Sequence, residues 1–382
     1  MRYNADMDKK PRVALIHDYL NQYGGAEKTL EEIMKIFPEA PIFTGIYDPK
    51  KVPPVFSKRK VFSLNNSILS NFPKYLTFLM PLVFESFDLS NFDLIISDGT
   101  AWPKGVLTKP SQLHIAYVHT PPRFLYKYSV ESTKRNAFYF KPFVTVIDHY
   151  LRIWDYMAAQ RPDALVTNSR ETRSRIKKFY RRDARVINPP VNVTHAKVPP
   201  IRHARTSYYI VLGRMSAYKN FDIVIKAFNE LPNLKLVVVG TGVEEKRLKK
   251  LAKKNVMFVG YASEERKHTL IKNSLGLINA VEDEDFGIVP LEVMGHGRPV
   301  LAHKSSGHLE TVIEGTNGMF FENLRHTELA KKIKVFDQLI KDNKFDEKLI
   351  AKSVQQFSEE RFIKEFGNFV TKAWEKFNKE NA

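Results

Sequence analysis

The chain is organised around the stretch Glu284-Asp285-Phe286-Gly287-Ile288-Val289-Pro290-Leu291-Glu292, whose two glutamates are separated by seven residues. The apolar run 275–280 before it predicts a buried parallel strand, and 293–300 after it predicts a short helix that stops at glycine. Glu284 is therefore expected on a loop at the carboxyl end of a strand, and Glu292 in the helix that follows. Ligands of open α/β sheets bind at this edge, where a helix start offers backbone N–H groups to an anion such as a diphosphate.

Two glutamates at this spacing also occur on ordinary solvated helices, so the surrounding residues carry the argument. The run from Glu284 to Val300 resembles the E-x7-E signature of retaining glycosyltransferases, specifically glycosyltransferase family 4. The resemblance implies that Glu284 holds sugar hydroxyls beside the reacting carbon and that Glu292 binds the ribose hydroxyls. It also assigns to substrate binding the four residues at the helix start, Asp285, Phe286, Gly287 and Ile288.

Length and composition favour a globular protein of two domains. The chain has 382 residues, which is too long for one ordinary core. Of these residues 43% are hydrophobic and 27% charged, as in globular proteins. It contains no cysteine, which excludes a disulfide framework and a thiolate metal site. Neither a signal peptide nor a run of about 18 apolar residues is recognisable. We expect a cytoplasmic protein that can also be peripheral on the inner face of the cytoplasmic membrane.

The net charge of +18 is unevenly distributed along the chain. Residues 1–200 carry 30 lysines and arginines against 18 acidic residues, and residues 201–382 carry 30 against 24. A basic face can attract nucleic acid, an anionic membrane or a phosphorylated substrate, and it can also be only a solvated surface. The basic residues form no nucleic-acid-binding motif, so a membrane or a diphosphate is favoured over nucleic acid.

A glycine pair in the first half predicts a ligand-binding loop. Gly24 and Gly25 follow the apolar run 13–17 and precede a predicted helix, which permits close approach of the backbone to a ligand. A tight turn without a ligand is the alternative. Family 4 enzymes have a similar Gly-Gly-x-Glu loop facing the diphosphate and the acceptor, so the resemblance assigns Gly24 and Gly25 to substrate binding.

A histidine is expected at the carboxyl end of a second strand. His119 follows the apolar run 113–118 and precedes the Pro-Pro turn at 121–122, although a lone histidine is more often structural. Residues 117–126, Tyr-Val-His-Thr-Pro-Pro-Arg-Phe-Leu-Tyr, resemble the mid-domain motif of bacterial mannosyltransferase-like members of family 4. The resemblance implies that His119 touches the donor sugar and the reacting phosphate, and that Arg123 meets a phosphate of the acceptor.

The stretch 55–87 is basic and aromatic, and Pro81 interrupts it. It predicts either an amphipathic surface that lies on a bilayer or receives a lipid tail, or a helical stripe that faces the core. Both interpretations stay open.

In the second half, Arg214 and Lys219 bracket a loop between a predicted strand and a helix. Two cations there can neutralise a diphosphate, although a surface pair is the alternative. The pattern Gly-Arg-x4-Lys-Asn matches family 4, in which these cations hold the donor diphosphate. Tyr261 ends the run 256–261, which by resemblance lies beside the nucleotide base. A nicotinamide site is not favoured, because Glu245 replaces the last glycine of G-x-G-x-x-G.

The acidic run 282–285 resembles a metal site in composition. However, no Asp-x-Asp motif is placed on a strand end, and the family holds its diphosphate with arginine, lysine and a helix dipole. We therefore expect no metal and no other cofactor, the nucleotide sugar being a substrate.

Alternating strands and helices predict an α/β protein with parallel sheets covered by helices on both faces. The resemblance implies two Rossmann-like domains facing across a cleft, the GT-B type of glycosyltransferase. Residues 1–200 would form the acceptor-side domain, 201–361 the nucleotide-sugar domain, and 362–382 a helix that returns to the first domain.

The predicted function is retaining transfer of a hexose, α-mannose from GDP-mannose, to a lipid-linked or polysaccharide-precursor acceptor. Three alternatives stay open: a UDP-sugar donor, a sugar-nucleotide epimerase of the same architecture, and a basic nucleic-acid-binding protein.

Overall fold

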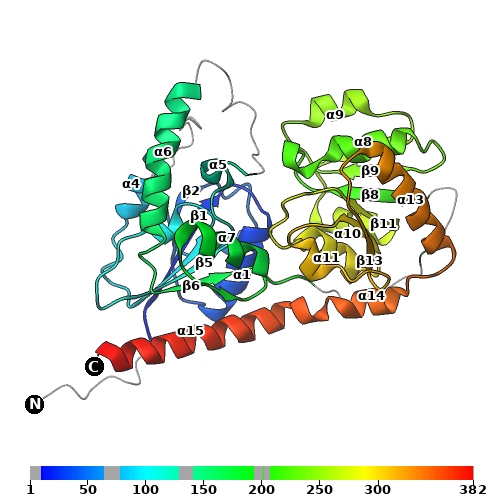
Figure 1. Ribbon diagram of the computed structural model, residues 1–382. Coiled ribbons are helices and arrows are strands. Elements are labelled where there is room, and N and C mark those ends of the chain that lie inside the picture. The colour runs from blue at the N-terminus through cyan, green and yellow to red at the C-terminus, as the bar shows by residue number, and fades with distance from the viewer. Residues whose placement is uncertain (1–9, 64–77, 129–140, 193–200, 202–206, 382) are drawn as a thin grey trace, which may run out of the picture. The chain divides into compact units, whose positions relative to one another are not determined.

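The computed structural model describes residues 10–63, 78–128, 141–192, 201 and 207–381 (Figure 1). The chain divides into two compact units, each a parallel sheet with helices. The first unit contains most of the chain as far as Pro190 together with 359–382, and the second is built on 191–358. Among the described residues, no helix combines the length and the apolar content needed to cross a bilayer.

The first unit contains a sheet of seven parallel strands. Their spatial order is β3 (Val61–Ser63), β2 (Ile42–Tyr47), β1 (Val13–Leu20), β4 (Leu94–Gly99), β5 (Leu113–Val118), β6 (Ala164–Thr167) and β7 (Arg185–Val186). Strands β4 and β5 are buried along their whole length, as expected of continuous apolar runs in a parallel sheet. The strand order reverses between β1 and β4, and ligands of such sheets bind at the carboxyl ends beside this reversal.

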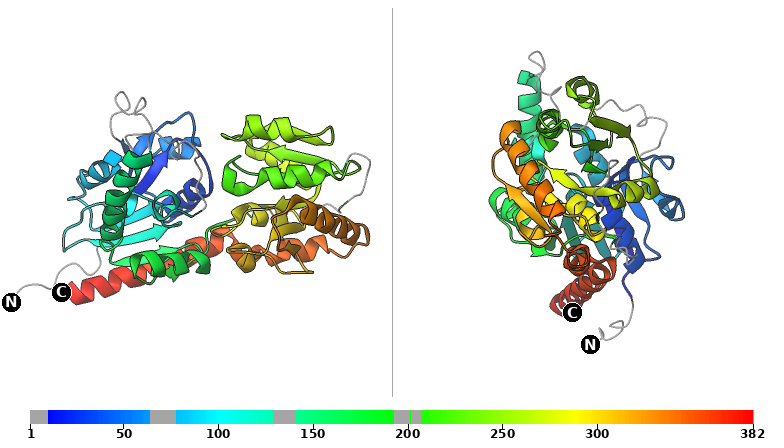
Figure 2. Two further views of the ribbon diagram at one scale, coloured as in Figure 1. Left: turned by 45° about the horizontal axis from the view of Figure 1, so that its top comes forward. Right: turned by 90° about the vertical axis from the view of Figure 1, so that its right-hand side faces the viewer.

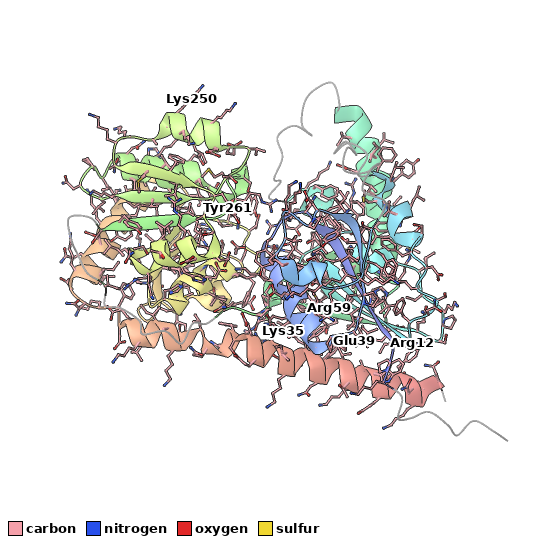
Figure 3. The ribbon with its side chains drawn as sticks, turned by 180° about the vertical axis from the view of Figure 1, so that it is seen from behind. Arg12, Lys35, Glu39, Arg59, Lys250 and Tyr261 are labelled. Carbon is pink, nitrogen blue, oxygen red and sulfur yellow. The ribbon has the colours of Figure 1, made fainter. Side chains whose placement is uncertain are left out.

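Helices cover both faces of this sheet (Figure 2). They are α1 (Gly25–Ile36), α2 (Pro54–Ser57), α4 (Met80–Glu85), α5 (Arg123–Tyr126), α6 (Lys141–Ala158), α7 (Arg170–Tyr180) and α15 (Glu359–Asn381), with the 3-10 turn η2 (Pro103–Gly105). Helix α15 buries the stripe Phe362, Phe366 and Val370, and the rings of Phe362 and Phe366 contact the ring of Tyr117 on β5. Lys35 of α1 lies 3.6 Å from Glu359 at the start of α15. Lys35 is labelled in Figure 3.

The basic and aromatic stretch 55–87 is described only in part, because 64–77 lies outside the described residues. In the described part, Phe56, Met80 and Phe84 are buried in the core, whereas Leu82 of α4 is 63% exposed. Phe62 and Phe78 are also exposed, at 36 and 37%, so the described part contains both core-facing and solvent-facing apolar side chains.

The second unit contains a sheet of six parallel strands. Their order is β10 (Val256–Gly260), β9 (Leu236–Val239), β8 (Tyr208–Leu212), β11 (Ser274–Asn279), β12 (Val300–His303) and β13 (Gly318–Phe321). The helices of this unit are α8 (Phe221–Asn229), α9 (Glu245–Leu251), α10 (Glu264–Lys272), α11 (Ile288–Gly295), α12 (His308–Thr311), α13 (His326–Lys341) and α14 (Glu347–Ser353). Here the order reverses between β8 and β11, so the loops that carry Lys219 and Glu284 follow the two strands at the reversal.

Three strand ends of the second unit are joined through their backbones. Gly213 N donates to Val239 O at 3.0 Å, and Gly240 N donates to Gly260 O at 2.8 Å. Gly240 has a φ of +127°, and a Cβ there would lie 1.9 Å from Gly213 O. Only glycine permits this approach, so Gly240 sets how closely the loops after β8 and β9 pack at the carboxyl edge.

Candidate functional site

A buried carboxylate joins two histidines at the carboxyl edge of the first sheet. Asp98 of β4 is fully buried, and its Oδ2 lies 2.8 Å from His17 Nδ1 on β1. Its Oδ1 lies 2.8 Å from Nε2 of His119, the residue that follows β5. The register aligns His17 with Asp98 across the β1–β4 pair, so the sheet itself brings these groups together.

A second carboxylate, that of Glu27 in the first turn of α1, faces the other side of His17. Its Oε1 lies 3.9 Å from His17 Nε2, and its Oε2 accepts a hydrogen bond from Gly24 N at 2.7 Å. Burial alone would lower the pKa of His17, but Asp98 and Glu27 outweigh it and raise this pKa to about 10. Burial alone would raise the pKa values of the two carboxyls, yet their histidine partners hold both below the usual range. The cluster therefore contains a histidinium between two carboxylates at neutral pH.

His119 is fixed by its ring and by its backbone. Its Nε2 is directed at Asp98, its backbone N donates to Gly99 O at 3.0 Å, and its carbonyl accepts from Asn168 Nδ2 at 2.8 Å. A carboxylate can only accept, so Nε2 carries the proton that it shares with Asp98. The other ring nitrogen, Nδ1, is then the atom of His119 that can meet a ligand.

The other predicted residues of the first unit lie at the starts of helices α1 and α5. Gly24 is the N-cap of α1 and Gly25 its first residue, so the predicted strand–loop–helix is confirmed. Gly24 has an extended φ of −137°, and Glu27 Oε2 would lie 3.3 Å from a Cβ at this position. Arg123 begins the short helix α5 and is partly buried.

We expect the protein to become less stable as the pH rises above neutrality, because His17 then loses its proton. The pKa of His17 in the folded protein exceeds the ordinary value of 6.5. Its contribution to the free energy of unfolding is therefore complete below pH 6.5 and is lost as the pH passes about 10. Denaturant unfolding from about pH 7 to about pH 10 measures this slope. His17→Gln should flatten the slope, and His326→Gln, a change at a partly exposed histidine of the second unit, should leave it unchanged. Equal slopes in all three proteins would contradict the assignment.

In the second unit, Lys219 and Glu284 form an ion pair. Lys219 Nζ lies 3.0 Å from Glu284 Oε2, and both side chains are largely buried. Asn220, with a φ of +54°, is the N-cap of α8 and donates from Nδ2 to Ala280 O at 2.9 Å. This bond fastens the loop after β8 to the loop after β11. Arg214 lies on the same β8 loop and is exposed.

The residues between the two glutamates form the start of α11. Gly287 is the N-cap with a φ of +95°, and Ile288 is the first helical residue. Phe286 is buried and its ring contacts that of Phe357, with centroids 5.3 Å apart. Glu284 O accepts from Gly307 N at 3.0 Å, which ties the backbone before the helix to the loop after β12. Asp285 lies on the same loop, and the predicted strand–loop–helix order is confirmed here.

Glu292 is buried in α11, and a lysine that sequence reasoning missed lies against it. Lys267 Nζ of α10 lies 3.2 and 3.3 Å from the two carboxylate oxygens of Glu292. Next to this pair, His268 Nδ1 and His296 Nε2 are 2.8 Å apart. Burial, followed by the nearby charge of His268, lowers the pKa of His296 to about 4. Any ribose that Glu292 binds would share this carboxylate with Lys267.

A neutral histidine lies behind the Lys219–Glu284 pair. His308 is fully buried, donates from Nδ1 to His303 O at 2.9 Å and accepts at Nε2 from Asn279 Nδ2 at 3.1 Å. Burial lowers the pKa of His308 to about 4.

Tyr261, after β10, is 80% exposed, and Figure 3 shows its position.

Sequence reasoning assigned no role to His17, Asp98, Lys267 or His308. A signal existed for the first two, because each directly follows or ends an apolar run that forms a strand. For Lys267 and His308 no comparable signal exists, since both lie in helices of mixed composition. No group of three metal-ligating side chains occurs within the ranges that the structure describes.

Comparison with known proteins gives one family model and several relatives. Residues 199–356 match the model described as "Glycosyl transferases group 1". The chain is 28% identical over 375 residues to alpha-1,3/1,6-mannosyltransferase alg2 of Schizosaccharomyces pombe, covering 83% of this chain and 72% of that protein. It is 25% identical to the Homo sapiens protein of the same name, covering 60% of this chain and 61% of the relative.

Solved structures support the fold. Sucrose-phosphate synthase from Thermosynechococcus elongatus superposes with a TM-score of 0.75 at 16% identity, over 96% of this chain and all of that one. Anabaena HepE in complex with UDP and glucose superposes with a TM-score of 0.66 at 18% identity, over 95% of this chain and all of that one. At these identities the likeness shows the fold, and the predicted pair of Rossmann-like domains is confirmed.

Proposed function

We propose that this chain, a glycosyltransferase of the GT-B fold, transfers α-mannose from GDP-mannose to a lipid-linked or polysaccharide-precursor acceptor, with retention at the anomeric carbon. The observation that carries the proposal is the Lys219–Glu284 pair at the start of α11, because it places a cation and a carboxylate beside a helix amino end. The relatives named above are alpha-1,3/1,6-mannosyltransferases, which supports mannose as the sugar.

The chemistry requires charge stabilisation at two points. When the anomeric C–O bond breaks, positive charge develops on the sugar ring and negative charge on the departing diphosphate. Arg214, Lys219 and the N–H groups at the start of α11 would stabilise the diphosphate. Glu284 would hold sugar hydroxyls beside the reacting carbon. His119 would contribute to binding of the sugar and the transition state through Nδ1.

The remaining predicted residues would bind the rest of the substrates. Glu292 would bind the ribose hydroxyls, Tyr261 would lie by the base, and Gly24 with Gly25 would face the diphosphate and the acceptor. Arg123 would meet an acceptor phosphate. We name no protein base, because in retaining transfer the leaving phosphate oxygen can take the acceptor proton.

We further propose that the enzyme belongs to glycosyltransferase family 4, needs no metal ion, and works as a peripheral protein at the inner face of the cytoplasmic membrane. A UDP-sugar donor is the second candidate, and HepE, which was solved with UDP and glucose, supports it. A sugar-nucleotide epimerase would bind the same nucleotides but would not release nucleoside diphosphate in an acceptor-dependent manner.

A thermal-shift panel without added metal tests the donor. We expect GDP and GDP-mannose to raise the unfolding temperature more than UDP, ADP and their sugar conjugates, because a ligand that binds only the folded state stabilises it. The expected gain is about 2.7 kcal/mol at a ligand concentration about 100 times Kd. Selective stabilisation by UDP would overturn the donor, and no response to any nucleotide would overturn the function.

A further inference from the structure

A lysine lies between two carboxylates where helices α10 and α11 meet. Lys267 Nζ lies 2.9 and 2.8 Å from the two carboxylate oxygens of Glu264, three residues earlier on α10. The same nitrogen lies 3.3 and 3.2 Å from the two oxygens of Glu292 on α11. The side chain of Glu264 is 51% exposed, whereas those of Lys267 and Glu292 are 11 and 10% exposed. The lysine therefore joins a solvated carboxylate to a buried one.

Helix α10 is held against the α11 segment by contacts besides this ion pair. His268 Nδ1 lies 2.8 Å from Nε2 of His296, the C-cap residue of α11. Arg298 donates from Nε and Nη2 to the carbonyl of Lys272, the last residue of α10, at 3.0 and 2.6 Å. Packing of the two helices therefore has supports other than Lys267. Because a buried ion pair often adds little net stability, the contact between Lys267 and α11 is better explained by function.

The distances show which carboxylate the lysine binds more closely. Charge-assisted bonds from an ammonium to a carboxylate are about 2.7 to 2.9 Å long, and Lys267 makes bonds of this length to Glu264. Its distances to the two oxygens of Glu292 are both longer, and they are nearly equal. The cation therefore faces the Glu292 carboxylate symmetrically without closing on either oxygen. An ionised carboxylate can accept about four hydrogen bonds, so both oxygens keep acceptor capacity.

We propose that Lys267 is a positioning residue for Glu292, and that it makes the donor site selective for a nucleotide with both ribose hydroxyls. The inference rests on the proposed function in one respect, that Glu292 binds the ribose of the donor. Two neighbouring hydroxyls can each donate a hydrogen bond to one oxygen of the same carboxylate. Lys267 would hold both oxygens in place for these hydroxyls and offset the cost of a buried negative charge.

Calorimetric titration of the full chain with GDP and with 2′-deoxy-GDP tests this role. We expect the wild type to bind GDP about 10-fold more tightly or better, because 2′-deoxy-GDP leaves one oxygen of the buried Glu292 without its partner. Lys267→Met should reduce this preference to less than about threefold, chiefly by weakening GDP binding, since Glu292 then loses the charge that orients it. Lys267→Gln, which also lacks the charge but stays polar, should lose the preference in the same way.

Two further variants separate the charge from the packing. Lys267→Arg keeps a cation beside Glu292 and should retain a preference of about fivefold or more. Lys250→Met is the matched control, because Lys250 is an exposed lysine of α9 in the same unit (Figure 3). Its Kd values for both nucleotides should stay within about twofold of those of the wild type.

Two results would overturn the role of Lys267 and leave the proposed function standing. One is a wild type that binds GDP and 2′-deoxy-GDP equally. The other is a pair of uncharged variants, Lys267→Met and Lys267→Gln, that keep the wild-type preference or weaken both nucleotides by the same factor, which would make the lysine a support of the fold only. A wild type that binds no nucleotide would instead remove the proposed function, and this role with it. A wild type that selects UDP is tested in the same way with UDP and 2′-deoxy-UDP.

Discussion

Replacing Gly240 by alanine is expected to lower the free energy of unfolding of the second unit by about 4 kcal/mol, near the top of the range for single substitutions. The added Cβ would lie 1.9 Å from Gly213 O, and Gly240 has a φ of +127°. The opposing atom belongs to a backbone that donates from Gly213 N to Val239 O, so it cannot move aside as a flexible side chain would. Denaturant unfolding of the purified variant measures the loss.

Gly315→Ala is the matched control for this prediction. Gly315 also has a positive φ, of +76°, but no atom lies within 4 Å of the position that its Cβ would take. It should therefore show only the cost of the backbone conformation, about 1 kcal/mol. If the two variants lost the same stability, the close approach of the β8 and β9 loops would not be the cause.

Replacing Glu284 by glutamine is expected to lower kcat by about 1,000-fold while changing the Kd of GDP by less than about threefold. The proposed role of Glu284 is exerted on the sugar, so removing its charge acts on the transition state more than on the diphosphate. Lys219, which is 3.0 Å from Glu284, keeps its charge in this variant and can still bind the diphosphate. Steady-state turnover and calorimetric titration with GDP measure the two quantities.

Two further variants sharpen this test. Lys219→Met should weaken GDP binding by about 10-fold or more, because it removes a cation from the proposed diphosphate site. Glu265→Gln, a change of the same kind at an exposed position of α10, should alter neither quantity. A Glu284→Gln enzyme with wild-type turnover, or one that loses turnover only through weakened GDP binding, would contradict the role of Glu284.

Much of the fold could be predicted because buried parallel strands are continuous apolar runs. The runs ending near Asp98, Val118 and Asn279 were identifiable in this way, and they positioned His119 and Glu284 at carboxyl strand ends. The structure confirms those strand ends. The roles proposed for the residues there stay predictions.

Partners distant in sequence could not be predicted from local patterns. His17 and Asp98 are 81 residues apart, and they meet only because β1 lies beside β4, which no periodicity reveals. Lys267 and Glu292 meet across two helices whose packing is set by the sheet beneath them. The exposed apolar row of α6 from Val146 to Met157 has the spacing of a core stripe, and periodicity alone does not tell whether such a stripe points inward or outward.

The packing of α15 on the first unit has a consequence for synthesis of the chain. Phe362 and Phe366 complete the surroundings of Tyr117, whose hydroxyl donates to Ile187 O at 2.8 Å. On the ribosome, the first unit is therefore without part of its core until the residues beyond Phe366 have emerged. The second unit, built on 191–358, is fully synthesised before that point. The half of the protein that is translated first is thus the half that finishes folding last.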